Sequence, residues 1–535
     1  MIGYDTLSFF KVKPYWIYVL VSLSMILLTA CTETQPRINY PVTDLSKAPL
    51  IPKPLQVTPT GTAFGLDAKT VIFTDSTVGF LEVGQLLANS ISARLPFKIP
   101  INPKQEVDAP RTIRLQQCDT LPMTSPEAYR LNITNNTVLL QARTAEGAFR
   151  GMQTLKQLIP EQRNDTLAKL PMWLLPSGTI RDTPNFPYRG VMLDVARHFF
   201  SVEEVKQFLE VLAYYKYNTL HLHLTDDQGW RIQIASWPKL TQIGARTEVG
   251  GSMGGFYTQE DFKELVAYAA ERHIVIIPEV DMPGHTNAAN LSYPIFHAKG
   301  RAETPRVRTD MKVGYSSFDT RKDTLYQFLD EVIEEITTLT PGPYFHIGGD
   351  ESMATPKKDY INFIEKVTHI VNSKEKYVIG WNEIAQADLP STAVVQFWND
   401  PKIALKAAQK GLKVILSPAK KIYLDMKYDS LSKHGLDWAG HITVKDAYDW
   451  DPETYIPNLP EAQILGLEAP LWSETIADLT ALEYLAFPRA IGYAELGWTP
   501  KELRHWEDYR LRLAAQKPYL KRRNIQYYPS PNIDW

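Results

Sequence analysis

Two adjacent carboxylates, Asp350 and Glu351, directly follow an apolar segment, 344–347, and the pair Gly348-Gly349. The segment Tyr-Phe-His-Ile is short and aromatic, which is typical of a buried strand. The glycines free the backbone from the alternation of a strand, so both carboxylates can reach one pocket. Because two close carboxylates resist ionising together, one of them can keep a proton for general-acid chemistry. A solvated acidic turn or a helix N-terminus is the alternative interpretation.

Metal chemistry is a second possibility, suggested by His221 and His223. They alternate on one predicted strand, so both imidazoles could bind one metal ion. The later strands offer no clear set of further histidine ligands, since His346 lies within a strand rather than after it. We therefore expect these histidines to form hydrogen bonds inside the fold, and we expect neither a metal nor another cofactor.

The elements that must position these side chains alternate regularly from residue 188 onward. Ser201 and Glu204 form a capping box that opens an amphipathic helix. About eight strand–helix repeats over about 300 residues predict an α/β fold, a (β/α)8 TIM barrel, with a doubly wound sheet as the alternative. The predicted strands are 190–195, 219–224, 274–279, 344–347, 377–379, 394–397, 414–416 and 464–467.

A barrel predicts that polar and aromatic residues gather where its strands end, because active sites lie at the C-terminal rim. The sequence places such residues there after every predicted strand. They are Asp194, Arg197, His198, Thr225, Asp226, Asp227, Trp230, Glu279, Asp281, His285, Asp350, Glu351, Trp381, Asn382, Glu383, Trp398, Tyr423, Asp425, Glu468, Trp472 and Glu474.

The chain length allows a further domain before the barrel. It has 535 residues, a formal net charge of −3 and 22% charged residues, so no basic excess points to nucleic acid. Residues 51–180 mix predicted strands with a helix at 146–159, which indicates a small N-terminal α+β domain. Residues 184–535 would form the catalytic barrel with a C-terminal helix.

The N-terminus resembles a bacterial lipoprotein signal. Lys11 and Lys13 precede an apolar run, 15–28, which is shorter than the roughly 20 residues of a membrane span. Leu-Thr-Ala-Cys resembles a lipobox ending at Cys31, so residues 1–31 would be the signal peptide and 32–50 a tether. A plain signal peptide or an uncleaved anchor is the alternative. We expect lipid anchoring in the cell envelope. The outer membrane is the expected destination, because Thr32 stands after Cys31 where an inner-membrane retention signal would resemble Asp. We expect the other cysteine, Cys118, to be a small buried residue.

The barrel segments, in order over about 300 residues, resemble the catalytic domain of the family 20 glycoside hydrolases, the β-N-acetylhexosaminidases. The matching pieces are YRGVMLDVARHF, NTLHLHLTDDQGWRI, PEVDMPGH, FHIGGDE, GWNE, YLDMKY, DWAG and EAPLWSE. Residues 51–180 resemble the small domain that precedes this barrel in many members. The resemblance implies substrate-assisted catalysis, in which the substrate's 2-acetamido oxygen attacks the anomeric carbon and forms an oxazolinium intermediate.

By this resemblance Glu351 is the general acid and then the base, Asp350 holds the acetamido N–H, and Tyr423 donates to the acetamido oxygen. The resemblance assigns the remaining residues to binding. The walls of the acetamido pocket would be Trp381, Trp398 and Trp472, and the outer hydroxyls would be bound by Arg189, Asp425 and Glu474. Asp226 and His285 would orient Glu351. Trp438 would stack on the next sugar. Without the family, Arg189 would more simply be a structural ion-pair residue.

The resemblance therefore implies an exo-acting, retaining β-N-acetylhexosaminidase. Its partner would be a glycan or oligosaccharide that ends in a β-linked N-acetylglucosamine, or in N-acetylgalactosamine. Release of a disaccharide, as in the lacto-N-biosidases of the family, and a glycan-binding lipoprotein without catalysis are the alternatives. We expect the membrane to be contacted only through the lipid anchor.

Overall fold

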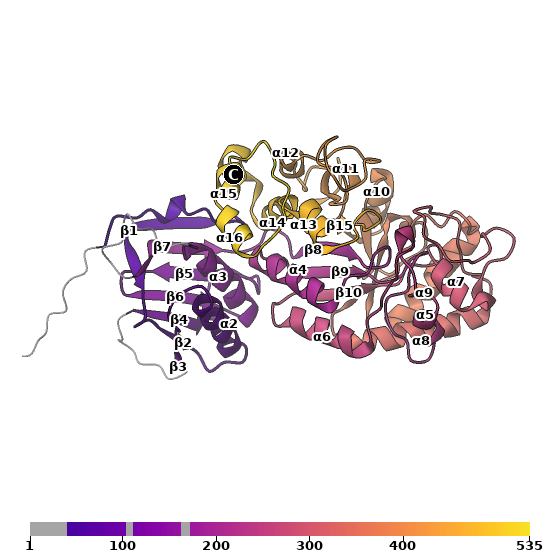
Figure 1. The fold of residues 1–535 in the computed structure, drawn as a ribbon, viewed down its shortest axis with the longest axis horizontal. Helices are drawn as coiled ribbons and strands as arrows, with labels where there is room; N and C mark the ends of the chain where they lie inside the picture. The colour runs from indigo at the N-terminus through magenta and orange to yellow at the C-terminus, as the bar shows by residue number, and fades with distance from the viewer. Residues whose placement is uncertain (1–39, 103–110, 162–171) are drawn as a thin grey trace, which may run out of the picture. The chain divides into compact units, whose positions relative to one another are not determined.

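The computed structural model describes residues 40–102, 111–161 and 172–535 of the chain (Figure 1). The predicted signal peptide, Cys31 and the first part of the predicted tether lie outside the described residues. None of the helices in the described part combines the length and the apolar composition that a transmembrane segment requires.

The N-terminal part is a mixed sheet of strands in the order β1-β7-β5-β6-β4-β2-β3, with helices α2 and α3 packed on it. The predicted hairpin is present as the antiparallel pair β5 and β6. The prediction of a small α+β domain is therefore confirmed. The elements are β1 (Gln56–Leu66), β2 (Val71–Thr74), α2 (Phe80–Ser92), β3 (Ile101–Asn102), β4 (Thr112–Gln117), β5 (Tyr129–Ile133), β6 (Thr137–Ala142), α3 (Ala145–Leu158) and β7 (Trp173–Asp182).

The end of the predicted tether belongs instead to the folded core. A short 3-10 helix, η1 (Leu45–Lys47), is capped by Asp44, and Leu45 and Leu50 are almost fully buried. The Leu50 carbonyl accepts a hydrogen bond of 2.8 Å from Arg512. The tether prediction is thus wrong for this part, because Leu45 and Leu50 belong to the hydrophobic core although the surrounding segment is polar and rich in proline. Cys118 was also expected to be buried and is only half-buried.

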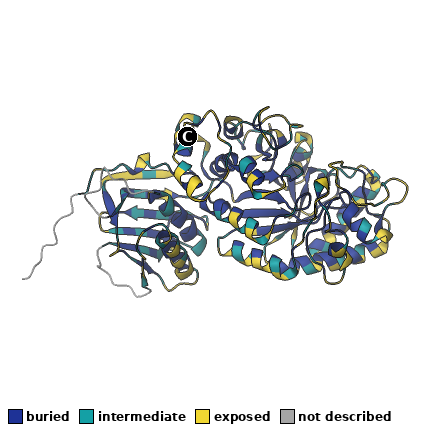
Figure 2. Ribbon diagram, viewed as in Figure 1, coloured by how far each residue is buried: buried dark blue, intermediate teal, exposed yellow. Residues whose placement is uncertain are grey.

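The remainder forms the closed, parallel barrel that the sequence predicted, with strand order β10-β11-β12-β13-β14-β15-β8-β9. The strands β8 and β9 are buried at every residue, as expected when helices cover a parallel sheet (Figure 2). The barrel strands are β8 (Tyr188–Asp194), β9 (Thr219–His223), β10 (Val275–Glu279), β11 (Tyr344–His346), β12 (Tyr377–Trp381), β13 (Val394–Phe397), β14 (Lys413–Leu416) and β15 (Ile464–Leu471).

Helices follow the strands and begin at local signals. The capping box of Ser201 and Glu204 is present, and Thr258 and Asp261 form a second one. The helices of this part are α4 (Val202–Tyr214), α5 (Lys239–Gln242), η3 (Val249–Gly251), α6 (Gln259–Ala270), α7 (Asn287–Ser292), η4 (Pro294–Phe296), α8 (Asp323–Leu339), α9 (Lys357–Ser373), η5 (Asn382–Gln386), α10 (Pro401–Gln409), α11 (Ala419–Ile422), α12 (Val444–Tyr448), η6 (Glu461–Gln463), α13 (Leu479–Ala486), α14 (Arg489–Trp498), η7 (Lys501–Leu503), α15 (Trp506–Ala514) and α16 (Lys517–Arg522).

Polar side chains fill the barrel interior. His221 lies 2.9 Å from Glu468 and 3.0 Å from Glu279, and His223 lies 2.6 Å from Glu279. The strand histidines therefore form internal hydrogen bonds, as expected. Glu468 was predicted to follow the last strand, but β15 extends to Leu471 and carries Glu468 inside it, where it also accepts a hydrogen bond of 2.7 Å from Gln396.

Candidate active site

The turn after β11 has a backbone that only glycine tolerates easily. Gly348 and Gly349 have φ angles of 64° and 102°, and the Gly349 N–H donates to Asp281 Oδ1 at 3.0 Å. A Cβ on Gly348 would fall 1.9 Å from that same oxygen. Glu351 also has a positive φ, 44°. This turn breaks the alternation of the strand and lets both Asp350 and Glu351 face one cavity, as the sequence predicted.

That cavity has a volume of about 610 Å³ and lies at the C-terminal ends of the barrel strands. Both carboxylates line it, together with four of the five tryptophan and tyrosine residues that the sequence placed at the rim and with two further acids, Asp425 and Glu474. The lining residues are Arg197, Met311, Val313, Asp350, Glu351, Trp381, Trp398, Asn399, Tyr423, Asp425, Leu436, Trp438, Trp472 and Glu474. A concave site of this size, with apolar walls and a few converging charges, suits a small ligand such as one sugar unit.

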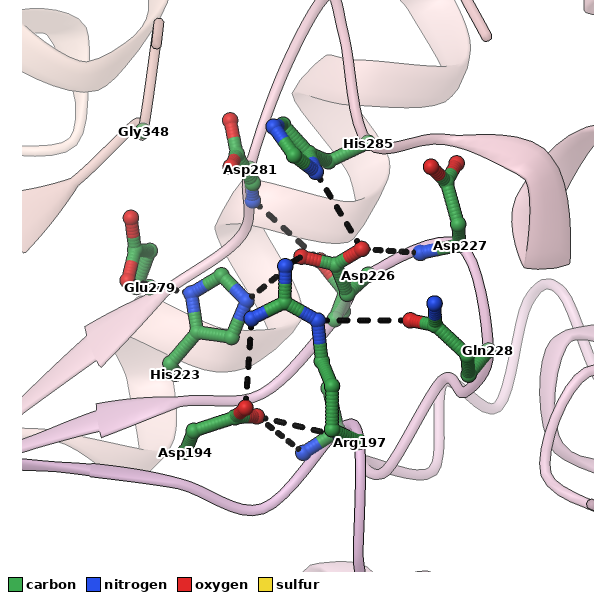
Figure 3. A network of polar contacts seen from close by, with 12 residues as sticks. Asp194, Arg197, His223, Asp226, Asp227, Gln228, Glu279, Asp281, His285 and Gly348 are labelled. Atoms are coloured by element: carbon green, nitrogen blue, oxygen red, sulfur yellow. Dashed lines mark hydrogen bonds and ion pairs between the residues drawn. The ribbon is translucent and has the colours of Figure 1, made fainter. Parts of the chain in front are cut away.

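Beneath the carboxylates, Asp226 joins three cationic partners (Figure 3). Its Oδ2 lies 2.8 Å from Arg197 Nη2 and 3.1 Å from His223 Nε2, and its Oδ1 lies 3.2 Å from His285 Nδ1. Burial by itself raises the pKa of Asp226, but Arg197 and His285 outweigh it and hold that pKa well below its usual range. Asp226 is therefore a fixed negative charge.

His285 connects this charge to the catalytic pair. Its Nε2 lies 3.6 Å from Asp350 Oδ2 and 3.6 Å from Glu351 Oε2. Burial opposes protonation of the ring, but Asp226 and Asp350 outweigh burial and raise the pKa of His285 well above its usual range. The positions predicted for Asp226 and His285, behind the acid rather than in the cavity lining, agree with this geometry.

Glu351 has the electrostatic setting of a general acid. Burial, and then the neighbouring Asp350 carboxylate, raise the pKa of Glu351 above its ordinary value, whereas His285 acts in the opposite direction. A carboxyl group with a raised pKa keeps its proton closer to neutral pH, where it can protonate a leaving group. Asp350 Oδ1 is buried and has no hydrogen-bond partner among the described residues, so it can accept one from a ligand.

Tryptophans wall the cavity, and polar partners hold two of them. The Trp381 indole N–H donates to Glu279 Oε1 at 2.9 Å, and the Trp381 and Trp472 rings lie 5.6 Å apart. The Trp398 indole N–H faces both oxygens of Glu383 at 3.3 Å. Trp438 is 55% exposed at the mouth. The arrangement gives a closed, apolar end of the cavity and an open, aromatic mouth.

Carboxylates and one arginine occupy another side of the cavity. Within the described structure, both oxygens of Asp425 and Oε2 of Glu474 are buried and have no hydrogen-bond partner. Burial, followed by the Glu474 charge, raises the pKa of Asp425 well above its usual value. Arg197 Nη1 lies 3.8 Å from Glu474 Oε1. Unpartnered acceptors beside a guanidinium can bind the vicinal hydroxyls of a sugar.

Arg189 is not part of this site, which corrects the prediction made from the family resemblance. It opens β8 at the opposite end of the barrel from the cavity, where its guanidinium forms a buried ion pair with Glu127 of the N-terminal domain. It also donates to the Phe186 carbonyl at 2.8 Å. The arginine in the cavity is Arg197, in the same motif but beyond the end of the strand. The simple structural interpretation of Arg189 is the correct one.

Other cavity residues had no predicted role. Asn399 follows Trp398, Leu436 precedes Trp438 by two positions, and Met311 and Val313 lie on the long connection between β10 and α8. For Arg197, its place just after the first strand was a usable signal. Met311 and Val313 lie in a connection without strand or helix periodicity, so the sequence offered no signal for them.

Several groups of buried or half-buried histidines and acids lie close enough together to ligate a cation, among them His285, Asp350 and Glu351, and His221, Glu279 and His346. Most of these side chains already form hydrogen bonds or ion pairs with each other. The chemistry open to the site without a metal is proton transfer by Glu351, with charge stabilisation by Asp350.

Comparisons with known proteins agree with this geometry. Residues 186–361 and 352–501 match the model of the catalytic domain of glycosyl hydrolase family 20, and residues 47–183 match that of domain 2 of the same family. A β-N-acetylhexosaminidase of Cellulomonas fimi is 39% identical over 491 residues, covering 91% of this chain and 97% of the relative.

Solved structures give the same result. A family 20 β-N-acetylhexosaminidase of Streptomyces coelicolor superposes with a TM-score of 0.86 at 42% identity, covering 92% of this chain and 99% of that chain. A mutant β-hexosaminidase of Streptomyces plicatus, in complex with its product GlcNAc, gives a TM-score of 0.86 at 43% identity, covering 92% and 98% of the two chains.

Proposed function

The chain belongs to glycosyl hydrolase family 20 and is an exo-acting β-N-acetylhexosaminidase, and from this premise we propose that it cleaves by substrate-assisted catalysis. The acetamido oxygen of the terminal sugar attacks the anomeric carbon as the glycosidic C–O bond breaks. Glu351 gives its proton to the leaving oxygen. An oxazolinium intermediate results. Because the acetamido oxygen is a nucleophile held beside the reacting carbon, its effective concentration is high.

In the second half of the reaction Glu351, now ionised, takes a proton from water. The water oxygen attacks the anomeric carbon from the face that the leaving group vacated, the ring of the intermediate opens, and the configuration is retained. Asp350 accepts a hydrogen bond from the acetamido N–H and stabilises its positive charge. The Tyr423 hydroxyl orients the acetamido oxygen. Burial raises the pKa of Tyr423 well above its usual value, which keeps the hydroxyl protonated.

One observation carries the proposal: Asp350 and Glu351 line a single cavity together with Trp381, Trp398 and Trp472. A closed aromatic end suits the methyl group of an acetamide, and the buried, unpartnered Asp350 Oδ1 suits its N–H. We propose that Arg197, Asp425 and Glu474 bind the outer hydroxyls. The product GlcNAc in the Streptomyces plicatus complex supports N-acetylglucosamine as the terminal sugar.

Paired aryl glycosides test the proposal. The β-N-acetylglucosaminide and the β-glucoside of the same phenol differ only at the 2-position, so we expect hydrolysis of the first and none of the second. Comparable hydrolysis of both would remove the acetamido nucleophile from the mechanism. Activity confined to an aryl disaccharide would favour release of a two-sugar unit. The aryl β-N-acetylgalactosaminide, run in parallel, measures tolerance at the fourth hydroxyl.

We also propose that the enzyme is a lipoprotein, anchored through Cys31 in the outer membrane of the bacterial cell envelope. Support comes from the sequence Leu-Thr-Ala-Cys after a short apolar run. In cells fed a labelled fatty acid, the wild type should take up label and sediment with membranes, and Cys31→Ser should do neither. Fatty-acid label on the Cys31→Ser protein would contradict the prediction that Cys31 is the lipidated residue of a lipobox.

A further inference from the structure

The mouth of the cavity is apolar on the side of the general acid. Among the lining residues, the charged Arg197 and Asp425 are buried, whereas Val313 is half-buried and Met311 is 50% exposed. Met353 comes two residues after Glu351 and is 72% exposed. Large exposed apolar side chains beside a catalytic group indicate a contact surface for a ligand.

Met353 lies against the connection that carries Met311 and Val313. A Cβ on Gly314, next to Val313, would fall 2.9 Å from Met353 Sδ and 3.4 Å from the Glu351 carbonyl oxygen. The Met353 N–H donates to that carbonyl at 2.6 Å, so Met353 belongs to the same turn as the acid. Met311 and Val313 line the cavity together with Glu351, and Met353 lies against the same connection at Gly314; we call these three residues the methionine shelf.

The backbone under the shelf is held firmly. Gln228 Nε2 donates to the Asp310 carbonyl at 2.8 Å, and the Gly250 N–H donates to the Thr309 carbonyl at 2.9 Å. Beyond the shelf, Ser316 Oγ donates to Asp227 Oδ1 at 2.5 Å. Asp227 and Gln228 directly follow Asp226 of the network behind the acid (Figure 3). The shelf is thus a fixed backbone that presents adaptable side chains.

We propose that the methionine shelf binds the leaving sugar and makes the enzyme tolerant of its linkage. The inference rests on the proposed function, because Glu351 must touch the leaving oxygen and the sugar behind that oxygen must then lie at the shelf. Thioether and alkyl groups adapt their shape and offer no directional hydrogen bond. Such a surface accepts the apolar face of a pyranose in several orientations, with Trp438 as the other contact at the mouth.

The test compares substrates with and without a leaving sugar. The fluoride of β-N-acetylglucosamine has a leaving group too small to reach the shelf, whereas β1,3-, β1,4- and β1,6-linked disaccharides place a sugar on it. For the wild type we expect kcat/KM values within about 10-fold across the three linkages, because apolar contacts discriminate weakly. In the Met311→Ser/Met353→Ser double variant we expect kcat/KM to fall about 10-fold on every disaccharide, mainly through KM, and to stay within about 2-fold on the fluoride.

Val307→Ser is the matched control, because Val307 lies on the same connection and is 62% exposed but belongs neither to the cavity lining nor to the methionine shelf. It should behave as the wild type. Equal loss on the fluoride and the disaccharides would overturn the shelf, as would disaccharide kinetics unchanged by the double variant. If the wild-type kcat/KM for one linkage exceeded that for the others by more than about 100-fold, the proposal that the shelf makes the enzyme tolerant of linkage would be wrong. Failure of the wild type to hydrolyse the fluoride would instead overturn the proposed function.

Discussion

The two ring nitrogens of His285 face two different carboxyl groups: Nδ1 lies 3.2 Å from Asp226 Oδ1, and Nε2 lies 3.6 Å from Glu351 Oε2. Because Asp226 is a fixed anion, it keeps the ring protonated. The general acid therefore has a permanent cation beside it, which limits how far burial and Asp350 can raise its pKa.

His285→Gln should shift the pH profile. Glu351 must be protonated to act as the acid, so activity is lost as the pH rises through its pKa. Removal of the His285 cation raises that pKa, and we expect the basic limb of kcat/KM to move to higher pH. The measurement is a pH–rate profile on an aryl substrate. His369→Gln, on the exposed face of α9, serves as control. An unmoved basic limb would show that His285 does not control the acid.

Glu351→Gln should remove proton donation and leave binding largely intact. We expect kcat to fall by about 10²- to 10⁴-fold on disaccharides, because general-acid catalysis is worth about that much. The loss should be much smaller for an aryl glycoside whose phenolate leaves without a proton. Kinetics on a series of phenols gives the dependence, and the same loss on all of them would count against Glu351 as the acid.

Asp350→Asn should instead reduce turnover on every leaving group alike. Asp350 acts on the acetamido group, not on the leaving oxygen, so the loss should not follow the acidity of the phenol. Loss of a preorganised charge contact of this kind costs about 10²- to 10³-fold in kcat. Near-normal turnover in a folded Asp350→Asn protein would show that the Asp350 carboxylate does not stabilise the acetamido group in the reaction.

Two arginines of one motif should differ in their effect on substrate binding. Arg197 lines the cavity, so Arg197→Met should lower kcat/KM by about 10- to 150-fold through lost charged hydrogen bonds to the sugar. Arg189→Met leaves Glu127 short of one partner in a buried ion pair, so it should lower the free energy of unfolding by about 3–5 kcal/mol. Denaturant unfolding and steady-state kinetics on both variants separate the roles. A raised KM in a folded Arg189→Met protein would restore Arg189 to the site.

Glu383 should make the folded enzyme sensitive to high pH. Burial, followed by the Asp350 charge, raises the pKa of Glu383 to about 8. Its folded pKa lies above the unfolded value, so its contribution to stability falls as the pH rises from about 4.3 to about 8. Glu383→Gln cannot ionise at this position, so it does not lose this stability as the pH rises. The free energy of unfolding of Glu383→Gln minus that of the wild type should therefore increase between pH 5 and pH 9. Glu461→Gln, an exposed control, should show no such trend; a flat difference for Glu383→Gln as well would refute the raised pKa.

The features that could be predicted from the sequence are those that local pattern and local chemistry both indicate. Strand–helix alternation is a local property, so the barrel and the small domain before it were both predictable. The pair Asp350-Glu351 was identified because a glycine pair after an apolar strand restricts the backbone locally. The ends of the strands were less certain, as Glu468 shows, because β15 continues past the predicted apolar run.

By itself, then, the sequence determined the barrel, the reacting carboxylates and the aromatic residues around them, since each follows from residue type and short-range spacing. Only the tertiary structure decided that Arg197 and not Arg189 reaches the cavity, because the two ends of a parallel strand look alike in sequence but open on opposite ends of the barrel. It also decided that Leu45 and Leu50 belong to a core and that Met353, beside the acid, packs next to Gly314 of a distant connection. Those contacts join residues far apart in the chain, and no local periodicity records them.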